Sequence, residues 1–167
     1  MESRAKLFGH PIHQMLIVFP LGLLATSLFF DVIGLTTNHS GLLRASWYMI
    51  AAGVISGLIA AVFGFIDYLG IPSGTRAVRV GRLHGLGNVV VVLLFSVSWY
   101  LRIPNPGNPG MLPVILSAIG ASLGGITGWL GGELVDRLGV GVDDGANLDA
   151  PSSLTHDTAE ARETINR

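Results

Sequence analysis

Four long apolar segments, each nearly free of charge, constrain this chain more than any other feature of its sequence. They lie at about 12–35, 45–68, 83–101 and 111–134. A helix needs about 20 residues to cross the hydrocarbon core of a bilayer, so each segment can span a membrane. Only 13% of the residues are charged, whereas a soluble domain of this size carries about twice that share. The sequence therefore predicts an integral protein of the lipid bilayer.

The links between these segments are short, at about 36–44, 69–82 and 102–110. Short links make neighbouring helices antiparallel. We therefore expect an all-α membrane protein, an up-down-up-down four-transmembrane-helix bundle formed by residues 1–138. Residues 139–167 are polar and acidic, and we expect a partly disordered cytoplasmic tail in which the capping-box spacing of Asp157 and Glu160 starts a short helix.

Basic residues indicate the orientation of the bundle. An even number of spans places both termini on one side, and near the spans that side has six basic residues, whereas the other has only Arg44 and Arg102. Basic loops stay in the cytoplasm, so both the N- and C-termini should be cytoplasmic. The six residues are Arg4, Lys6, Arg76, Arg79, Arg82 and Arg137.

The charge balance and the lack of cysteine exclude several classes of function. A net charge of −1 argues against a nucleic-acid partner. Without cysteine, the chain has no disulfides, thiolate metal sites or iron–sulfur clusters. No nucleotide-binding loop or nucleophile motif is present, so the sequence leaves open whether the protein is an enzyme.

Small residues recur every four positions in the second and fourth segments. Such stripes let helices approach closely in lipid, which predicts packing within the bundle. The same stripes could instead form a face for a flat cofactor, a partner subunit or a homo-oligomer. The glycines concerned are Gly53, Gly57, Gly120, Gly124, Gly128 and Gly132.

Polar residues that are costly inside a membrane gather at one end of the four segments. An ionisable side chain at mid-membrane costs about 2.5–3.5 kcal/mol on insertion scales. The first and third segments begin on the side where the second and fourth end, so these residues should reach one membrane level. They are His10, His13, Asp67, His84, Asn88 and Glu133.

Three kinds of chemistry fit this set. Histidines on facing helices can ligate haem b, and His84 with His13 or His10 has that arrangement. Histidines together with Asp67 and Glu133 could instead bind a zinc, iron or manganese ion. The group could also pass protons in a transporter or an enzyme, or simply cap helices at the interface.

At the same motifs the chain resembles a known family. HPIH, an apolar run with Pro20, G-x-I-D-Y, R-x-H-x-x-x-N and GGELV occur in this order and are similar to the bacterial membrane family catalogued as domain of unknown function 2231 (DUF2231). The resemblance covers about residues 7–143 and implies a four-helix domain of the bacterial inner membrane. It also implies a distant similarity to two-haem cytochromes, and members occur joined to cytochrome-like or Rieske-like modules.

The resemblance favours an electron-transfer subunit that works with redox proteins. Carried over to this chain, its recurring polar positions are the same six residues. If His13 and His84 bind haem, we expect Asp67 and Glu133 to orient the imidazoles or hold ions around them, and Asn88 to lie in the same surrounding layer. The chain departs from the pattern after GGELV, where the family often has tyrosine and histidine and this sequence has Asp136 and Leu138. At most three histidines are therefore left for a haem or metal centre. The alternatives are a non-haem metal or proton site and a structural subunit that docks a partner.

Overall fold

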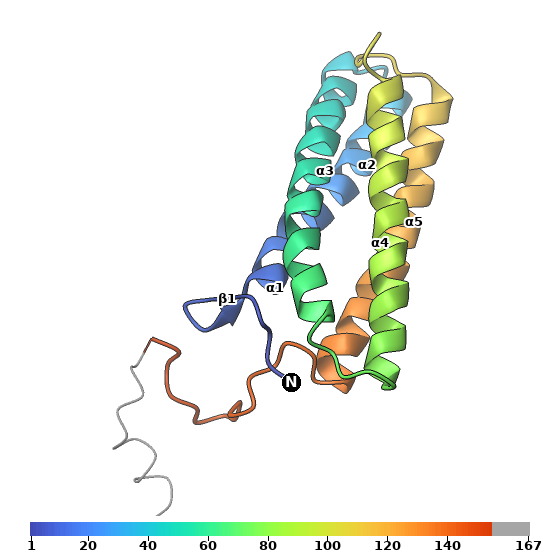
Figure 1. Cartoon of the computed structure of the whole chain (residues 1–167). Coiled ribbons are helices and arrows are strands. Elements are labelled where there is room, and N and C mark those ends of the chain that lie inside the picture. Colours follow the sequence, from blue (N-terminus) through green and yellow to red (C-terminus); the bar gives the residue numbers. More distant parts are fainter. Residues whose placement is uncertain (155–167) are drawn as a thin grey trace, which may run out of the picture.

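The computed structural model describes residues 1–154 and consists mainly of four long antiparallel helical spans (Figure 1). Each span is long and apolar enough to cross a membrane, which confirms the predicted all-α bundle. The predicted helix after Asp157 lies outside the described residues. The elements are β1 (Lys6–Leu7), β2 (His10–Pro11), α1 (Ile12–Leu16), α2 (Val18–Thr36), α3 (Ser40–Tyr68), α4 (Arg76–Leu101), α5 (Met111–Gly132) and the π-helical turn η1 (Glu133–Arg137).

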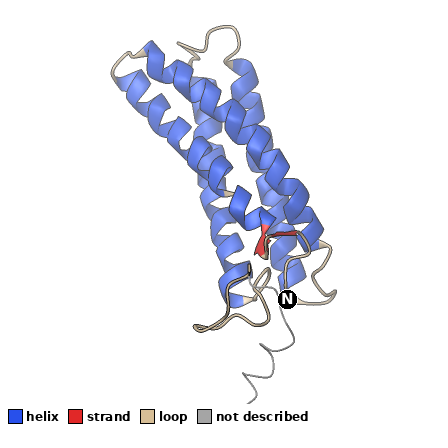
Figure 2. Ribbon diagram, turned by 90° about the vertical axis from the view of Figure 1, so that its left-hand side faces the viewer, coloured by secondary structure: helices blue, strands red, loops and turns tan. Residues whose placement is uncertain are grey.

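The spans form two helical hairpins that pack side by side. The first consists of α1, α2 and α3, and the second of α4 and α5 (Figure 1). Figure 2 shows the same bundle of helices after a turn of 90°. The end of the bundle that carries His13, His84 and the N-terminal segment is called the histidine end below. The opposite end, where α2 is joined to α3 and α4 to α5, is called the arginine end.

The first span is broken between α1 and α2, although the sequence predicts one continuous helix. Helix α1 ends at Leu16 and α2 begins at Val18. Pro20 explains this break, because it lacks an N–H and its ring clashes with the carbonyl of the residue four positions earlier, which is Leu16. His13 therefore lies on the short helix that precedes this break.

Helix α4 begins earlier than the predicted start at residue 83. The Thr75 side chain caps it by accepting a hydrogen bond from the N–H of Val78 at 3.3 Å. The sequence predicts Arg76, Arg79 and Arg82 in the link at about 69–82 that precedes this helix. They instead lie exposed on the first two turns of the helix.

The apolar core lies in the half of the bundle nearer the arginine end. Leu24, Ile50, Val91 and Phe95 are buried there, one from each of α2 and α3 and two from α4. Two glycines allow this packing. A Cβ at Gly53 would lie 2.6 Å from Leu24, and a Cβ at Gly120 would lie 2.9 Å from Phe95.

Arg102 closes this core with a fully buried ion pair. Its Nη1 and Nη2 each donate to one carboxylate oxygen of Asp31 at 2.7 Å, and both side chains are completely buried. The remaining donors reach three serine hydroxyls: Nε reaches Ser98 at 3.2 Å, Nη1 reaches Ser46 at 3.3 Å and Nη2 reaches Ser117 at 3.1 Å. All five N–H groups of the guanidinium thus have an acceptor. The network joins α2 and α3 to α4 and α5.

Replacing Arg102 by methionine should destabilise the fold severely, because the Asp31 carboxylate would remain buried without a counter-charge. We expect a loss of about 3–5 kcal/mol in the free energy of unfolding, measured by titration from a mild detergent into a denaturing one. Arg44→Met is the matched control, since Arg44 is exposed at the same end of the bundle and should cost little. Equal losses in the two variants would contradict the role of the ion pair.

Candidate imidazole site

His13 is held against the neighbouring helix by a backbone hydrogen bond. Its Nδ1 lies 2.8 Å from the carbonyl oxygen of Ala60 in α3. A carbonyl oxygen only accepts, so Nδ1 carries the proton in this contact. The ring lies over Gly64, where a Cβ would come within 2.8 Å of both Nδ1 and Cε1. Glycine therefore lets the imidazole reach the helix backbone.

His84 repeats this arrangement in the second hairpin. Its Nδ1 lies 2.8 Å from the carbonyl oxygen of Thr127 in α5, so this nitrogen also donates. The ring lies over Gly131, where a Cβ would be 3.1 Å from Cε1. In both hairpins the glycine follows the residue with the accepting carbonyl by four positions. It therefore lies one helical turn further along, next to that carbonyl on the helix surface.

The two imidazoles meet between the hairpins. Their ring centroids are 6.4 Å apart and the ring planes are nearly perpendicular, at 88°. Both rings are half-buried. Because both Nδ1 atoms donate to carbonyl oxygens, each neutral ring has the lone pair on Nε2. This is the nitrogen through which such an oriented histidine binds a metal.

Asn88 distinguishes the two histidines. Its Nδ2 lies 3.2 Å from Nε2 of His84, and its Oδ1 accepts a hydrogen bond from the Thr127 hydroxyl at 2.9 Å. The carbonyl oxygen of His84, 2.9 Å from Nδ2, only accepts, so Nδ2 is the donor and Nε2 of His84 accepts. Within the described part of the chain, Nε2 of His13 has no such partner. The corresponding position, four residues after His13, is Ile17.

The same spacings recur along the first helices of both hairpins. Asp31 follows His13 by 18 positions, and Arg102 follows His84 by the same number. Leu24 over Gly53 in the first hairpin corresponds to Phe95 over Gly120 in the second. The hairpins are therefore structural repeats, and both the ion pair and the imidazole pair join equivalent positions.

His10 lies apart from this pair. The first helix begins at Ile12, so His10 falls in the exposed strand β2 and not on a helix face with His13. Its Nε2 contacts the Ser153 hydroxyl at 3.2 Å. His10 therefore has a local partner at the protein surface.

Asp67 and Glu133 have hydrogen-bond partners other than the imidazoles at the histidine end. Asp67 Oδ1 accepts hydrogen bonds from the Ser3 hydroxyl at 2.7 Å and from the N–H groups of Arg4 and Ala5 at 2.8 and 3.2 Å. Glu133 accepts from Arg76 Nη2 at 2.6 Å. These contacts tie the N-terminal segment to α3, and η1 to α4.

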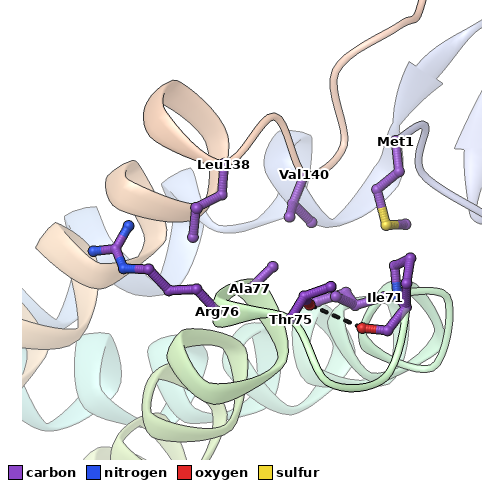
Figure 3. A pocket seen from close by; sticks show the side chains of 8 residues that line it. Met1, Ile71, Thr75, Arg76, Ala77, Leu138 and Val140 are labelled. Atoms are coloured by element: carbon purple, nitrogen blue, oxygen red, sulfur yellow. Dashed lines mark hydrogen bonds between the residues drawn. The ribbon is translucent and has the colours of Figure 1, made fainter.

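Among residues 1–154, no three His, Asp or Glu side chains come together as a metal site. The predicted five-residue metal set is therefore not assembled. The histidine end also has an apolar pocket of about 300 Å³, in which Leu138 and Val140 face Ile71 and Ala77 (Figure 3). None of the six predicted site residues lines it. The chemistry available between the hairpins is thus that of two neighbouring imidazoles.

These features define a multi-pass membrane protein with two repeated helical hairpins. The family described as "Predicted membrane protein (DUF2231)" matches residues 9–144, and the chain belongs to this family. The match confirms the resemblance seen in the sequence motifs. The comparisons with curated proteins and with solved structures gave no match.

The glycines beneath the rings provide a test of the site geometry. Gly131→Ala should push His84 away from the Thr127 carbonyl, because the added Cβ would lie 3.1 Å from Cε1. In protein with ¹⁵N-labelled histidine, we expect the slowly exchanging Nδ1 proton of His84 to disappear from the NMR spectrum.

Gly128→Ala is the matched control, since nothing lies within 4 Å of a Cβ at that position. It should leave the imidazole signals unchanged. Loss of the Nδ1 signal in the control, or its survival in Gly131→Ala, would contradict the described geometry.

Proposed function

We propose that His13 and His84 together hold a haem b group, and that the protein is an electron-transfer subunit of the bacterial inner membrane with both termini in the cytoplasm. The observation that carries this proposal is the imidazole pair between the two hairpins, with a centroid separation of 6.4 Å. The six basic residues at the histidine end support the orientation.

The ring separation is compatible with two imidazoles that share one metal. A metal–imidazole bond is about 2.0 Å long, and the ring centre lies about 1.2 Å beyond the nitrogen, so two imidazoles on one metal would have centroids at most about 6.4 Å apart. The Nδ1–H bonds to backbone carbonyls match the partners that orient metal-bound histidines in other proteins. The donor set therefore suits bis-histidine ligation.

Each residue has a separate task in this proposal. Bound haem supplies reversible one-electron transfer. His13 and His84 would hold this group through their Nε2 atoms, while the carbonyls of Ala60 and Thr127 keep the rings from turning. Asn88 must release Nε2 of His84 before this nitrogen can bind a metal.

A single zinc, iron or manganese ion is the second candidate. The edge-on approach of the two rings favours it, because a bare ion between the imidazoles needs much less room than a macrocycle. Two imidazoles leave open positions that water or a substrate could occupy. Asp67 and Glu133 are not ligands of the haem or of the metal ion in this proposal, because they accept hydrogen bonds from Ser3 and Arg76.

An absorption spectrum tests the haem proposal directly. Protein purified in detergent after expression with ample haem should show a Soret band and a pyridine haemochrome. Both should be lost in His13→Ala and in His84→Ala. His39→Ala is the control, because His39 caps α3 at the arginine end and should not affect the spectrum.

A colourless preparation would overturn the haem version. Elemental analysis then tests the second candidate, which requires one metal ion per chain that is lost in the same two variants. A preparation without haem or stoichiometric metal would overturn the imidazole-ligation proposal as a whole.

Asn88→Ala should strengthen binding, because Asn88 occupies the nitrogen that the metal would use. A neutral hydrogen bond contributes about 0.5–1.5 kcal/mol, so we expect up to about a tenfold lower dissociation constant for haem or metal. The measurement is a spectroscopic titration of cofactor-free protein. Weaker binding would show that Asn88 supports the liganded state.

A further inference from the structure

The β1–β2 hairpin presents an unusual apolar tip beside the first span. Lys6 pairs with Pro11 and Leu7 with His10 in an antiparallel ladder, so Phe8 and Gly9 form a two-residue turn. Leu7 is 47% exposed and Phe8 is 72% exposed. Figure 1 shows the hairpin projecting sideways from the bundle at the start of α1.

Phe8 occupies a backbone conformation that its side chain disfavours. The turn has φ of +50° at Phe8 and +84° at Gly9. Turns with positive φ at both central residues prefer Asn-Gly or Asp-Gly, and a bulky residue at the first position is strained. The fold therefore retains an aromatic side chain at a position where asparagine would be more stable, although most of that side chain contacts no other part of the protein.

The hairpin is firmly attached, so its exposure does not come from a loose terminus. The N–H of Ile12 donates to the carbonyl of Ala5 at 2.9 Å across the base of the hairpin. Asp67 binds the preceding residues through the Ser3 hydroxyl and the Arg4 N–H. The tip is thus held at a defined place relative to α1 and α3.

The tip also lies close to the start of the first span. Phe8 precedes the first residue of the span, Ile12, by four positions, and a strand rises about 3.3 Å per residue, so the tip lies within about 13 Å of the span. Exposed Phe and Leu side chains partition into the boundary between headgroups and acyl chains. Lys6, at the base of the hairpin, reaches back to Glu2 and Asp143, and the Glu2 hydrogen bond raises the pKa of Lys6.

We propose that the β1–β2 hairpin is an interfacial membrane anchor, with Leu7 and Phe8 inserted between the lipids of the leaflet at the histidine end. The partner is the lipid bilayer itself. This contact compensates for the strained turn, and it fixes the level of α1, which follows the hairpin without a linker. The proposal is independent of whether His13 and His84 bind a cofactor.

Spin labelling tests this anchor, and the chain suits it because it contains no cysteine. A nitroxide is attached to Phe8→Cys in the full chain, which is reconstituted in vesicles of zwitterionic and anionic phospholipid. Power saturation then compares collisions with oxygen, which dissolves in lipid, and with a water-soluble nickel chelate. We expect oxygen collisions to exceed nickel collisions several-fold.

Two further labels calibrate the result. Leu148→Cys lies on a fully exposed loop and should favour nickel, whereas Leu86→Cys, 60% exposed on α4, should favour oxygen. If Phe8→Cys fails to fold, Leu7→Cys provides a second probe of the tip and leaves Phe8 in place. Tip labels that behave like Leu148→Cys would overturn the proposal, and this is the result expected if the tip instead docks a partner protein.

Discussion

The ion pair between Asp31 and Arg102 is the interaction on which the rest of the structure depends. Within a membrane there is little hydrophobic gain from bringing two apolar hairpins together, so association relies on packing and polar contacts. Here a completely buried guanidinium has all five donors satisfied by Asp31 and three serines from three helices. Separating the hairpins would leave these charges in the apolar interior. The pair therefore specifies which hairpin faces meet, and in what register.

The repeat extends this register from one end of the bundle to the other. Asp31 and Arg102 occupy equivalent positions, and so do His13 and His84, 18 residues earlier in each hairpin. A correct pairing at the arginine end thus brings the imidazoles together at the histidine end. The two ends differ in packing, since the buried core lies beside the ion pair and the rings are only half-buried. The site lies where the bundle is less tightly filled.

The repeat is not exact, and its differences are concentrated at the site. Thr127 and Asn88 in the second hairpin correspond to Ala60 and Ile17 in the first. Their side chains hold His84 in one orientation, while Nε2 of His13 makes no hydrogen bond within the described residues. Both rings are held through Nδ1, so the two imidazoles differ at Nε2, and the proposed ligation would need Asn88 to release this nitrogen of His84.

The four spans could be predicted because length and hydropathy determine them, and the common level of His13 and His84 follows from the antiparallel order. The ion pair between Asp31 and Arg102 could not be predicted in this way. Arg102 follows the last residue of a helix and was assigned to the membrane surface, but its side chain turns back into the bundle to reach a residue 71 positions away. Backbone carbonyls as partners of the imidazoles also leave no signal in residue types. The equal spacing from each histidine to a charged residue was the available clue.

A double-mutant cycle on the ion pair tests this account most directly. The free energy of unfolding is measured for Asp31→Leu, for Arg102→Leu and for the variant with both changes. Each single change leaves one buried charge uncompensated, whereas the double change leaves an apolar contact between the hairpins. The account predicts that the double variant is more stable than either single variant. Additive losses would show that Asp31 and Arg102 do not hold the hairpins together.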